Sequence, residues 1–201
     1  MFSSSATLRV HTIIFGLAFA LTLLIGKSVQ AHDLGYRFEP GANVLVSNIN
    51  TNYSNAIGQT IADYDISTDL TVSSFYTCQL YGICFRQDDR GTGFPLARAI
   101  ARRTVSATTT YCANLSNGAL TGQCNTTTSK ANGGTIYLNI NASVRDFLDG
   151  NAVFVMKHET GHIFGMAHGD CNEVSVMVPG GCTLYYNALQ AHDKNTINSW
   201  Y

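Results

Sequence analysis

The chain has 201 residues, a formal net charge of −1 and only 12% charged side chains. Its 12 basic and 13 acidic residues form no basic cluster of the kind that contacts nucleic acid, so we expect no nucleic-acid partner. Hydrophobic residues make up 45% of the chain, enough for one substantial core.

The first 31 residues have the pattern of a secretory leader. Arg9 precedes an apolar run from Ile13 to Ile25, and small residues at positions 29 and 31 fit a signal-peptidase site. We therefore predict a signal peptide over residues 1–31 and a single domain over 32–201. The run is short for a bilayer span and no second run follows, so we expect a secreted, extracellular monomer with no membrane partner after leader removal.

The first half of the predicted domain mixes strand and helix signals. Residues 36–38, extended by 44–46, favour a first strand. Apolar side chains spaced three to four positions apart predict a helix over 52–69. Alternation of Thr, Val, Phe and Tyr predicts a strand over 70–77, and a small closed loop is expected over 78–84.

The middle of the chain is predicted to be richer in turns. Residues 88–93, Asp-Asp-Arg-Gly-Thr-Gly, indicate a surface turn. Its two carboxylates suggest calcium as an alternative use, although no complete calcium-loop pattern is present. One or two strands are expected within 96–110. The Asn-, Thr-, Ser- and Gly-rich stretch 111–134 is predicted to be a surface excursion rather than a second domain.

The last third has the clearest elements. Residues 135–140 predict a strand, and Asn151 is a suitable cap for a helix over 152–164. Residues 152–156 are all apolar, which indicates that this helix is buried. Residues 189–200 predict a terminal helix. The fold class expected from these elements is α+β.

Six cysteines in a secreted chain predict three disulfides. No Cys-x-x-Cys pair occurs, so the cysteines are not interpreted as metal ligands. Other pairings are open, but proximity in the sequence favours Cys78–Cys84, Cys112–Cys124 and Cys171–Cys182.

Three histidines have the spacing of a metal site. On a helix His158 and His162 lie one turn apart and point the same way. Gly165 can end that helix in a left-handed conformation and reverse the chain, so that His168 returns from another direction. Three imidazoles occupy three corners of the tetrahedron that zinc prefers and leave the fourth for water. We therefore predict Zn²⁺ as the cofactor, with Glu159 as the general base for that water.

Three residues after this motif are further candidates. Met177 lies in a loop bounded by proline and glycine, where it would form an apolar floor beneath the metal or fill the core. Tyr185 and Tyr186 follow, and would wall a substrate pocket. Core packing explains either tyrosine equally well.

The run from His158 to His168, followed by Ser175-Val176-Met177, resembles the zinc signature and Met-turn of the metzincin metallopeptidases. It is most similar to the small secreted snapalysin type, over about residues 135–201. The resemblance implies a twisted mixed sheet with two long helices in an upper subdomain, and a small C-terminal subdomain with the Met-turn and a terminal helix. It also implies three histidine ligands, a glutamate base and a Met-turn methionine at the positions named above.

Two positions depart from those relatives. Snapalysins have aspartate as the third ligand, whereas this chain has His168. Astacin-like enzymes have a tyrosine two positions after the turn methionine, whereas this chain has Pro179, so no fifth ligand is expected there.

These features predict a secreted zinc endopeptidase acting on protein or peptide substrates. The substrate would lie extended along an edge strand within 96–106. A non-catalytic secreted zinc-binding module is the alternative, but such a module has no use for Glu159. A copper oxidase with His32 as an N-terminal ligand is a third hypothesis.

Overall fold

The computed structural model describes residues 33–34, 36–39, 44–49, 52–75, 82–105, 108–114, 119–120 and 130–201. All of them belong to one compact unit, Ala31–Tyr201. The predicted signal peptide and His32 lie outside the described residues. None of the helices in the described part combines the length and apolar character needed to cross a membrane.

A six-stranded mixed sheet organises the described part of the chain, in the order β2-β1-β3-β8-β4-β5. The first four strands in this order are parallel, whereas β4 runs antiparallel to both β8 and β5. A separate two-stranded sheet pairs β6 with β7. The strands are β1 (Val44–Ile49), β2 (Val72–Phe75), β3 (Gly82–Asp88), β4 (Ala97–Val105), β5 (Thr108–Tyr111), β6 (Ala113–Asn114), β7 (Ala119–Leu120) and β8 (Gly133–Asn139).

Three of the strand predictions are confirmed: 70–77 contains β2, 96–110 contains β4 and most of β5, and 135–140 overlaps β8. The central strand β3 was missed. Its first four residues are all buried, so it shows no alternation of apolar and polar positions. The prediction that 44–46 extends a strand at 36–38 is wrong: β1 is separate, and Phe38 forms only an isolated bridge with Ala131.

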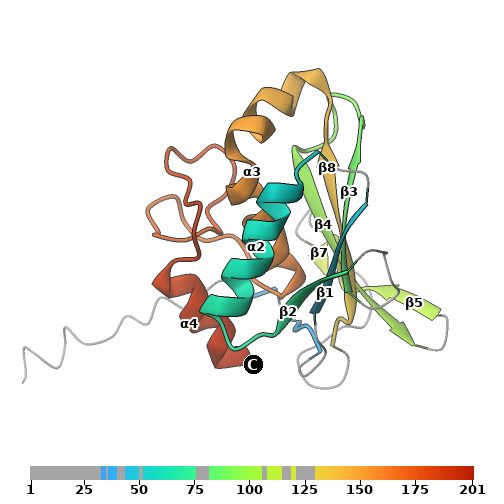
Figure 1. Ribbon diagram of the computed structural model, residues 1–201, viewed down its shortest axis with the longest axis vertical. Coiled ribbons are helices and arrows are strands. Elements are labelled where there is room, and N and C mark those ends of the chain that lie inside the picture. Colours follow the sequence, from blue (N-terminus) through green and yellow to red (C-terminus); the bar gives the residue numbers. More distant parts are fainter. Residues whose placement is uncertain are drawn as a thin grey trace, which may run out of the picture. The chain divides into compact units, whose positions relative to one another are not determined.

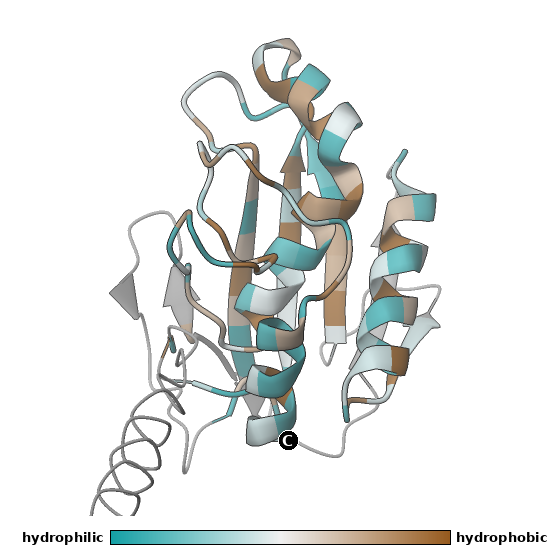
Figure 2. Cartoon of the chain, turned by 90° about the vertical axis from the view of Figure 1, so that its left-hand side faces the viewer, coloured by the Kyte–Doolittle hydropathy of each residue, from teal (hydrophilic) through white to brown (hydrophobic). Residues whose placement is uncertain are grey.

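Helices α2 (Ser54–Ser67) and α3 (Ala142–Ile163) lie on the same side of the sheet, and α4 (Ala191–Trp200) ends the fold (Figure 1). Each helix carries patches of hydrophobic and hydrophilic residues, as expected of helices that bury one side (Figure 2). The predicted helices at 52–69 and 189–200 are confirmed by α2 and α4. The chain is thus a mixed α+β protein.

Helix α3 begins earlier than predicted. Its N-cap is Asn141, whose side chain accepts a hydrogen bond from the N–H of Ser143 at 3.2 Å. Asn151, the predicted cap, instead lies inside the helix, where its backbone is non-helical (φ −129°, ψ 24°). The position is therefore a kink between two helical segments, and the second segment carries the histidine motif.

The predicted Cys171–Cys182 disulfide is present and closes the loop that contains Met177. Cys84 and Cys112 are also disulfide-bonded. Their predicted partners, Cys78 and Cys124, lie outside the described residues, so these two pairings stay predictions.

A buried ion pair holds α3 against α2. The Nζ of Lys157 lies 2.8 Å from Oδ2 of Asp63, and the two side chains are only 4% and 19% exposed. Lys157 also donates to the carbonyl of Asn187, and Asp63 accepts the N–H of Leu189 at 2.8 Å. The pair therefore also fixes the segment that follows Tyr185.

We predict that Asp63→Asn destabilises the protein by about 3 kcal/mol at neutral pH, because it leaves the buried ammonium of Lys157 without its counter-charge. Burial opposes ionisation of Asp63, but hydrogen bonds from Lys157, Leu189 and Ser67 outweigh it and lower the pKa of Asp63 below 3.8. A lowered pKa stabilises the fold above the unfolded-state value, so the difference should shrink as the pH falls through the acidic range below about 4.

Chemical denaturation at several pH values measures this difference. Asp88→Asn is the matched control, because its pair with Arg90 is surface-exposed and should contribute less than about 1 kcal/mol. Equal losses of stability from the two substitutions would contradict the stabilising role of the buried pair between Lys157 and Asp63.

Candidate metal centre

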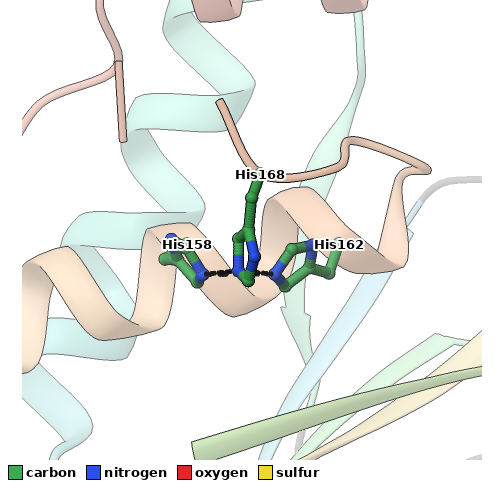
Figure 3. A group of neighbouring side chains, drawn as sticks. All are labelled: His158, His162 and His168. Carbon is green, nitrogen blue, oxygen red and sulfur yellow. Dashed lines mark hydrogen bonds between the residues drawn. The ribbon is translucent and has the colours of Figure 1, made fainter. Parts of the chain in front are cut away.

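The three predicted histidines converge on one point. His158 and His162 project from α3, and His168 approaches from the loop that follows it (Figure 3). Their Nε2 atoms form a triangle in which each side measures 3.1 Å. Among the described residues, this is the one group of histidine, cysteine or carboxylate side chains placed to share a metal ion.

The chain reversal between the second and third histidine follows from local geometry. Gly165 has φ +101°, a left-handed conformation that glycine adopts without strain. The N–H of Gly165 donates to the carbonyl of His162 at 3.1 Å, and the N–H of Met166 donates to the carbonyl of Gly161 at 3.0 Å. This pair of bonds is the Schellman motif that ends helices. It turns the chain back so that His168 faces the helix it has just left.

Backbone carbonyls orient two of the rings. The Nδ1 of His158 lies 2.8 Å from the carbonyl of Val176, and the Nδ1 of His162 lies 2.7 Å from the carbonyl of Met166. A carbonyl only accepts hydrogen bonds, so both Nδ1 atoms carry the proton. In the neutral rings the Nε2 lone pairs then point toward the centre of the triangle. This is the tautomer that a metal requires.

Burial keeps these rings neutral. Desolvation, together with the nearby His168, lowers the pKa of His158 to about 4. Desolvation also lowers the pKa of His162 well below its usual value, and that of His168 to a smaller extent. Metal ligands must be deprotonated, so all three rings are ready to bind at neutral pH.

The histidine triangle fits a metal ion. Two nitrogen ligands at about 2.0–2.1 Å on tetrahedral directions lie roughly 3.3–3.4 Å apart, close to the spacing seen here. Neutral His158 and His162 with protonated Nδ1 atoms have no hydrogen to share between their Nε2 atoms. Buried lone pairs that face one another without a donor are unfavourable, and a cation between them removes that cost.

A cavity of about 650 Å³ opens in front of the triangle and is lined by all three histidines and by Glu159. The carboxyl group of Glu159 is not part of the ligand cluster. It accepts a hydrogen bond from the backbone of Ala99 in β4. Burial nevertheless raises the pKa of Glu159 to about 8. The carboxyl is thus held between a strand and the histidines, in surroundings that favour its protonated form.

Met177 lies against the motif helix, as the sequence suggested. Its side chain is 2% exposed, and a Cβ placed on Gly161 would lie only 2.5 Å from its sulfur. The methionine therefore packs on the helix between His158 and His162. Its N–H donates a hydrogen bond to Ser175 Oγ at 2.9 Å. The neighbouring Val176, rather than Met177, supplies the carbonyl that orients His158.

Asp193, which was not predicted, anchors this turn. Its buried carboxylate accepts bonds from the hydroxyl of Ser175 at 2.5 Å and from the N–H of Val176 at 3.0 Å. It also accepts the N–H of Gln190 at 2.8 Å, within the capping box of α4. The terminal helix thus fixes the carbonyl that orients His158. An acidic residue near the start of the predicted helix 189–200 was the available signal.

Of the two candidate pocket tyrosines, the structure places Tyr185 in the cavity wall, whereas Tyr186 is not among the lining residues and packs against the core. Tyr185 contacts Phe147 and Phe154, with ring centroids 5.3 and 4.7 Å away. Neither phenylalanine was predicted. Phe147, Phe154 and His158 are seven and four positions apart on one helix, a spacing that could have indicated them.

The calcium alternative at 88–93 gains no support. Asp88 pairs with Arg90 at 3.0 Å, and Asp89 accepts bonds from Gly91 and Asn141. These carboxylates thus have protein partners, and they are absent from the metal-binding group found in the described part of the chain.

We predict that the folded chain binds one zinc ion, which should stabilise it by about 2.7 kcal/mol at a free concentration of 100 times Kd. His168→Ala should weaken binding by more than about 100-fold, because even loss of a ligand's outer partner costs roughly 10–100-fold. Calorimetric titration measures the affinity. His192→Ala, outside the cluster, should leave it unchanged, and equal affinities of all three proteins would exclude this site.

No protein-family model matches the chain, and no curated protein shows significant similarity to it. The metzincin resemblance therefore stays a prediction, and the function is inferred from the site itself.

Proposed function

We propose that the protein is a secreted zinc-dependent endopeptidase of the metzincin type. The observation that carries the proposal is the junction of three elements in one cavity: the histidine triangle, Glu159 and the start of β4. A zinc site used only for structure has no need of an adjoining cavity or carboxylate. The order of the sheet, with one antiparallel strand beside the cavity, agrees with the mixed sheet that the resemblance implies.

Glu159 acts as general base. A bound zinc ion would polarise the scissile carbonyl, lower the pKa of its water to about 7 and favour the ionised form of the neighbouring carboxyl. Glu159 accepts the proton of the attacking water and passes it to the leaving amine. The N–H of Ala99 steadies the carboxylate during this transfer.

The edge of β4 offers backbone groups to an extended peptide. Residues of an antiparallel strand alternate in the direction of their N–H and C=O groups. The N–H of Ala99 donates to Glu159, and the carbonyl of Ala101 accepts from the N–H of Cys112 at 2.9 Å. The backbone N–H and C=O groups of the alternate residues Ala97, Ala99 and Ala101 therefore point away from β8. A substrate strand would pair with Ala97 and with the carbonyl of Ala99, which places its scissile bond next to Glu159.

The aromatic wall selects the substrate side chain that enters the cavity. Phe147, Phe154 and Tyr185 form a continuous apolar surface, and Phe154 also contacts the ring of His158 at 5.5 Å. Aromatic surfaces favour large apolar partners. We therefore expect cleavage next to bulky hydrophobic residues.

We predict that Glu159→Gln retains one zinc ion but loses about 10²–10⁴-fold in kcat, because the amide cannot accept the water proton. Cleavage of a fluorescently quenched, denatured protein, measured beside metal content, tests this. Asp69→Asn, on an exposed side chain beyond the end of α2, is the matched control and should keep full activity.

Two results would count against this mechanism. Undiminished cleavage by Glu159→Gln would remove the glutamate from the chemistry. Full zinc occupancy with no cleavage of any denatured protein by the unmodified chain would favour the alternative, a non-catalytic zinc-binding module.

We predict that Tyr185→Leu lowers kcat/KM about tenfold for peptides with a bulky apolar residue next to the scissile bond, and changes it little for peptides with alanine there. Tyr186→Leu should leave kcat/KM unchanged for both sets of peptides, because the side chain of Tyr186 lies outside the cavity. Cleavage profiling of a peptide library compares the two variants. The same profile for both would show that the aromatic wall does not contact substrate.

A further inference from the structure

We propose that the described residues 33–34 and 36–39, here called the strap, form a positioning device for the metal centre, with Tyr36 as its principal positioning residue. The strap contacts the reversal between the second and third histidine, and none of its residues lines the cavity. The proposal rests on the metal centre proposed above, but it does not depend on peptide hydrolysis.

Tyr36 caps the helix at a metal ligand. Its side chain is fully buried, and its hydroxyl donates a hydrogen bond to the carbonyl of His162. The last carbonyls of a helix lack helical N–H partners and need bonds from elsewhere. The phenol supplies one at the residue whose ring contributes Nε2 to the triangle. The position of that ring is therefore tied to the strap.

The strap also pairs with the reversal itself. The N–H of Leu34 donates to the carbonyl of Gly165 at 2.9 Å, and Asp33 forms an antiparallel bridge with Met166. Met166 in turn offers its carbonyl to Nδ1 of His162 at 2.7 Å. The strap thus holds Met166, whose carbonyl sets the tautomer of His162. Met166 lies only two positions before His168.

The fit between strap and reversal leaves no room for a side chain. A Cβ on Gly165 would lie 2.2 Å from the carbonyl oxygen of Tyr36, a distance that atoms in contact cannot adopt. The glycine therefore serves two purposes: its positive φ makes the turn, and its lack of a side chain admits the strap.

Contacts on the other side fix the strap in place. Arg37 forms two bonds to the carboxylate of Asp33, at 2.6 and 2.7 Å, and stacks 3.5 Å above the ring of Trp200. The hydroxyl of Tyr201 accepts the N–H of Phe38 at 2.6 Å and donates to the carbonyl of Phe164 at 3.1 Å. The end of α4 thus clamps the strap against the end of α3.

The strap continues into the sheet. The N–H of Ala131 donates to the carbonyl of Arg37, and the N–H of Glu39 donates to the carbonyl of Ala131, both at 2.7 Å. Ala131 lies just before β8. A segment fixed to the sheet, to α4 and to the helix end transmits the rigidity of all three to the ligand loop.

The test compares Tyr36→Phe with Tyr64→Phe in the full chain. Both substitutions remove one buried phenolic hydroxyl that donates to a carbonyl of α3. The hydroxyl of Tyr64, however, donates to the carbonyl of Lys157 at 2.9 Å, away from the end of the helix. Zinc affinity is measured by competition with a chromophoric chelator. The absorption spectrum of the cobalt(II) form and the thermal unfolding of the metal-free protein are recorded for each.

We expect Tyr36→Phe to raise the zinc Kd by about 10–100-fold and to shift the cobalt(II) absorption bands, because an outer group that orients a ligand is lost. Tyr64→Phe should lower thermal stability and leave both metal readouts unchanged. Leu34→Pro removes the N–H that donates to the carbonyl of Gly165, and it should weaken zinc binding as Tyr36→Phe does. This variant gives a second test if Tyr36→Phe folds poorly.

A purely structural strap would give a different pattern. If Tyr36→Phe and Leu34→Pro lose stability but keep the zinc Kd and cobalt(II) spectrum of the unmodified chain, the positioning role is overturned, while the metal centre stands. If the unmodified chain binds neither zinc nor cobalt(II), both the metal centre and the positioning role of the strap are overturned. These measurements do not require an assay of hydrolysis.

Discussion

The reversal of the chain at Gly165 is the constraint on which the rest of the site depends. A helix by itself can present His158 and His162 side by side, but a third ligand must come from outside the helix axis. The Schellman bonds at residues 161–166 end α3 within one turn of His162 and send the chain back across it. Any other helix ending would carry His168 away from the triangle.

Around this reversal, the protein places backbone groups where a flexible side chain would be a poor support. The carbonyls of Val176 and Met166 fix two imidazole tautomers, and the N–H of Ala99 holds Glu159. Each of these groups belongs to a segment that is itself anchored: the Val176 turn by Asp193, Met166 by its bridge with Asp33, and Ala99 by its strand. Preorganised backbone dipoles cost little to hold in place once the fold has formed.

Burial gives the site its chemical bias. Desolvation keeps the imidazoles neutral and at the same time favours the protonated form of Glu159. A bound cation would accept the Nε2 lone pairs of the neutral rings and would favour the ionised form of Glu159. The arrangement is therefore best understood as a site built around a positive charge, with the cavity giving that charge access to a ligand from solvent.

The parts of this protein that the sequence alone determined are those fixed by short-range geometry. Local spacing identified the histidine group, α2 and α4, and glycine at 165 identified the turn, because helix periodicity and a left-handed backbone are local properties. Local signals misled at two places. Asn151 has the chemistry of a cap but marks a kink, and the first four residues of β3 are all buried, so that the strand shows no alternation.

Only the tertiary structure decided which distant groups support the ligands. The hydroxyl of Tyr36 meets the carbonyl of His162 across 126 positions, and Ser175 meets Asp193 across 18. Tyr185 and Tyr186 are adjacent and chemically identical, yet only the first lines the cavity. No periodicity encodes such choices, because they follow from how the sheet, the strap and α4 pack together, and that packing is a property of the whole chain.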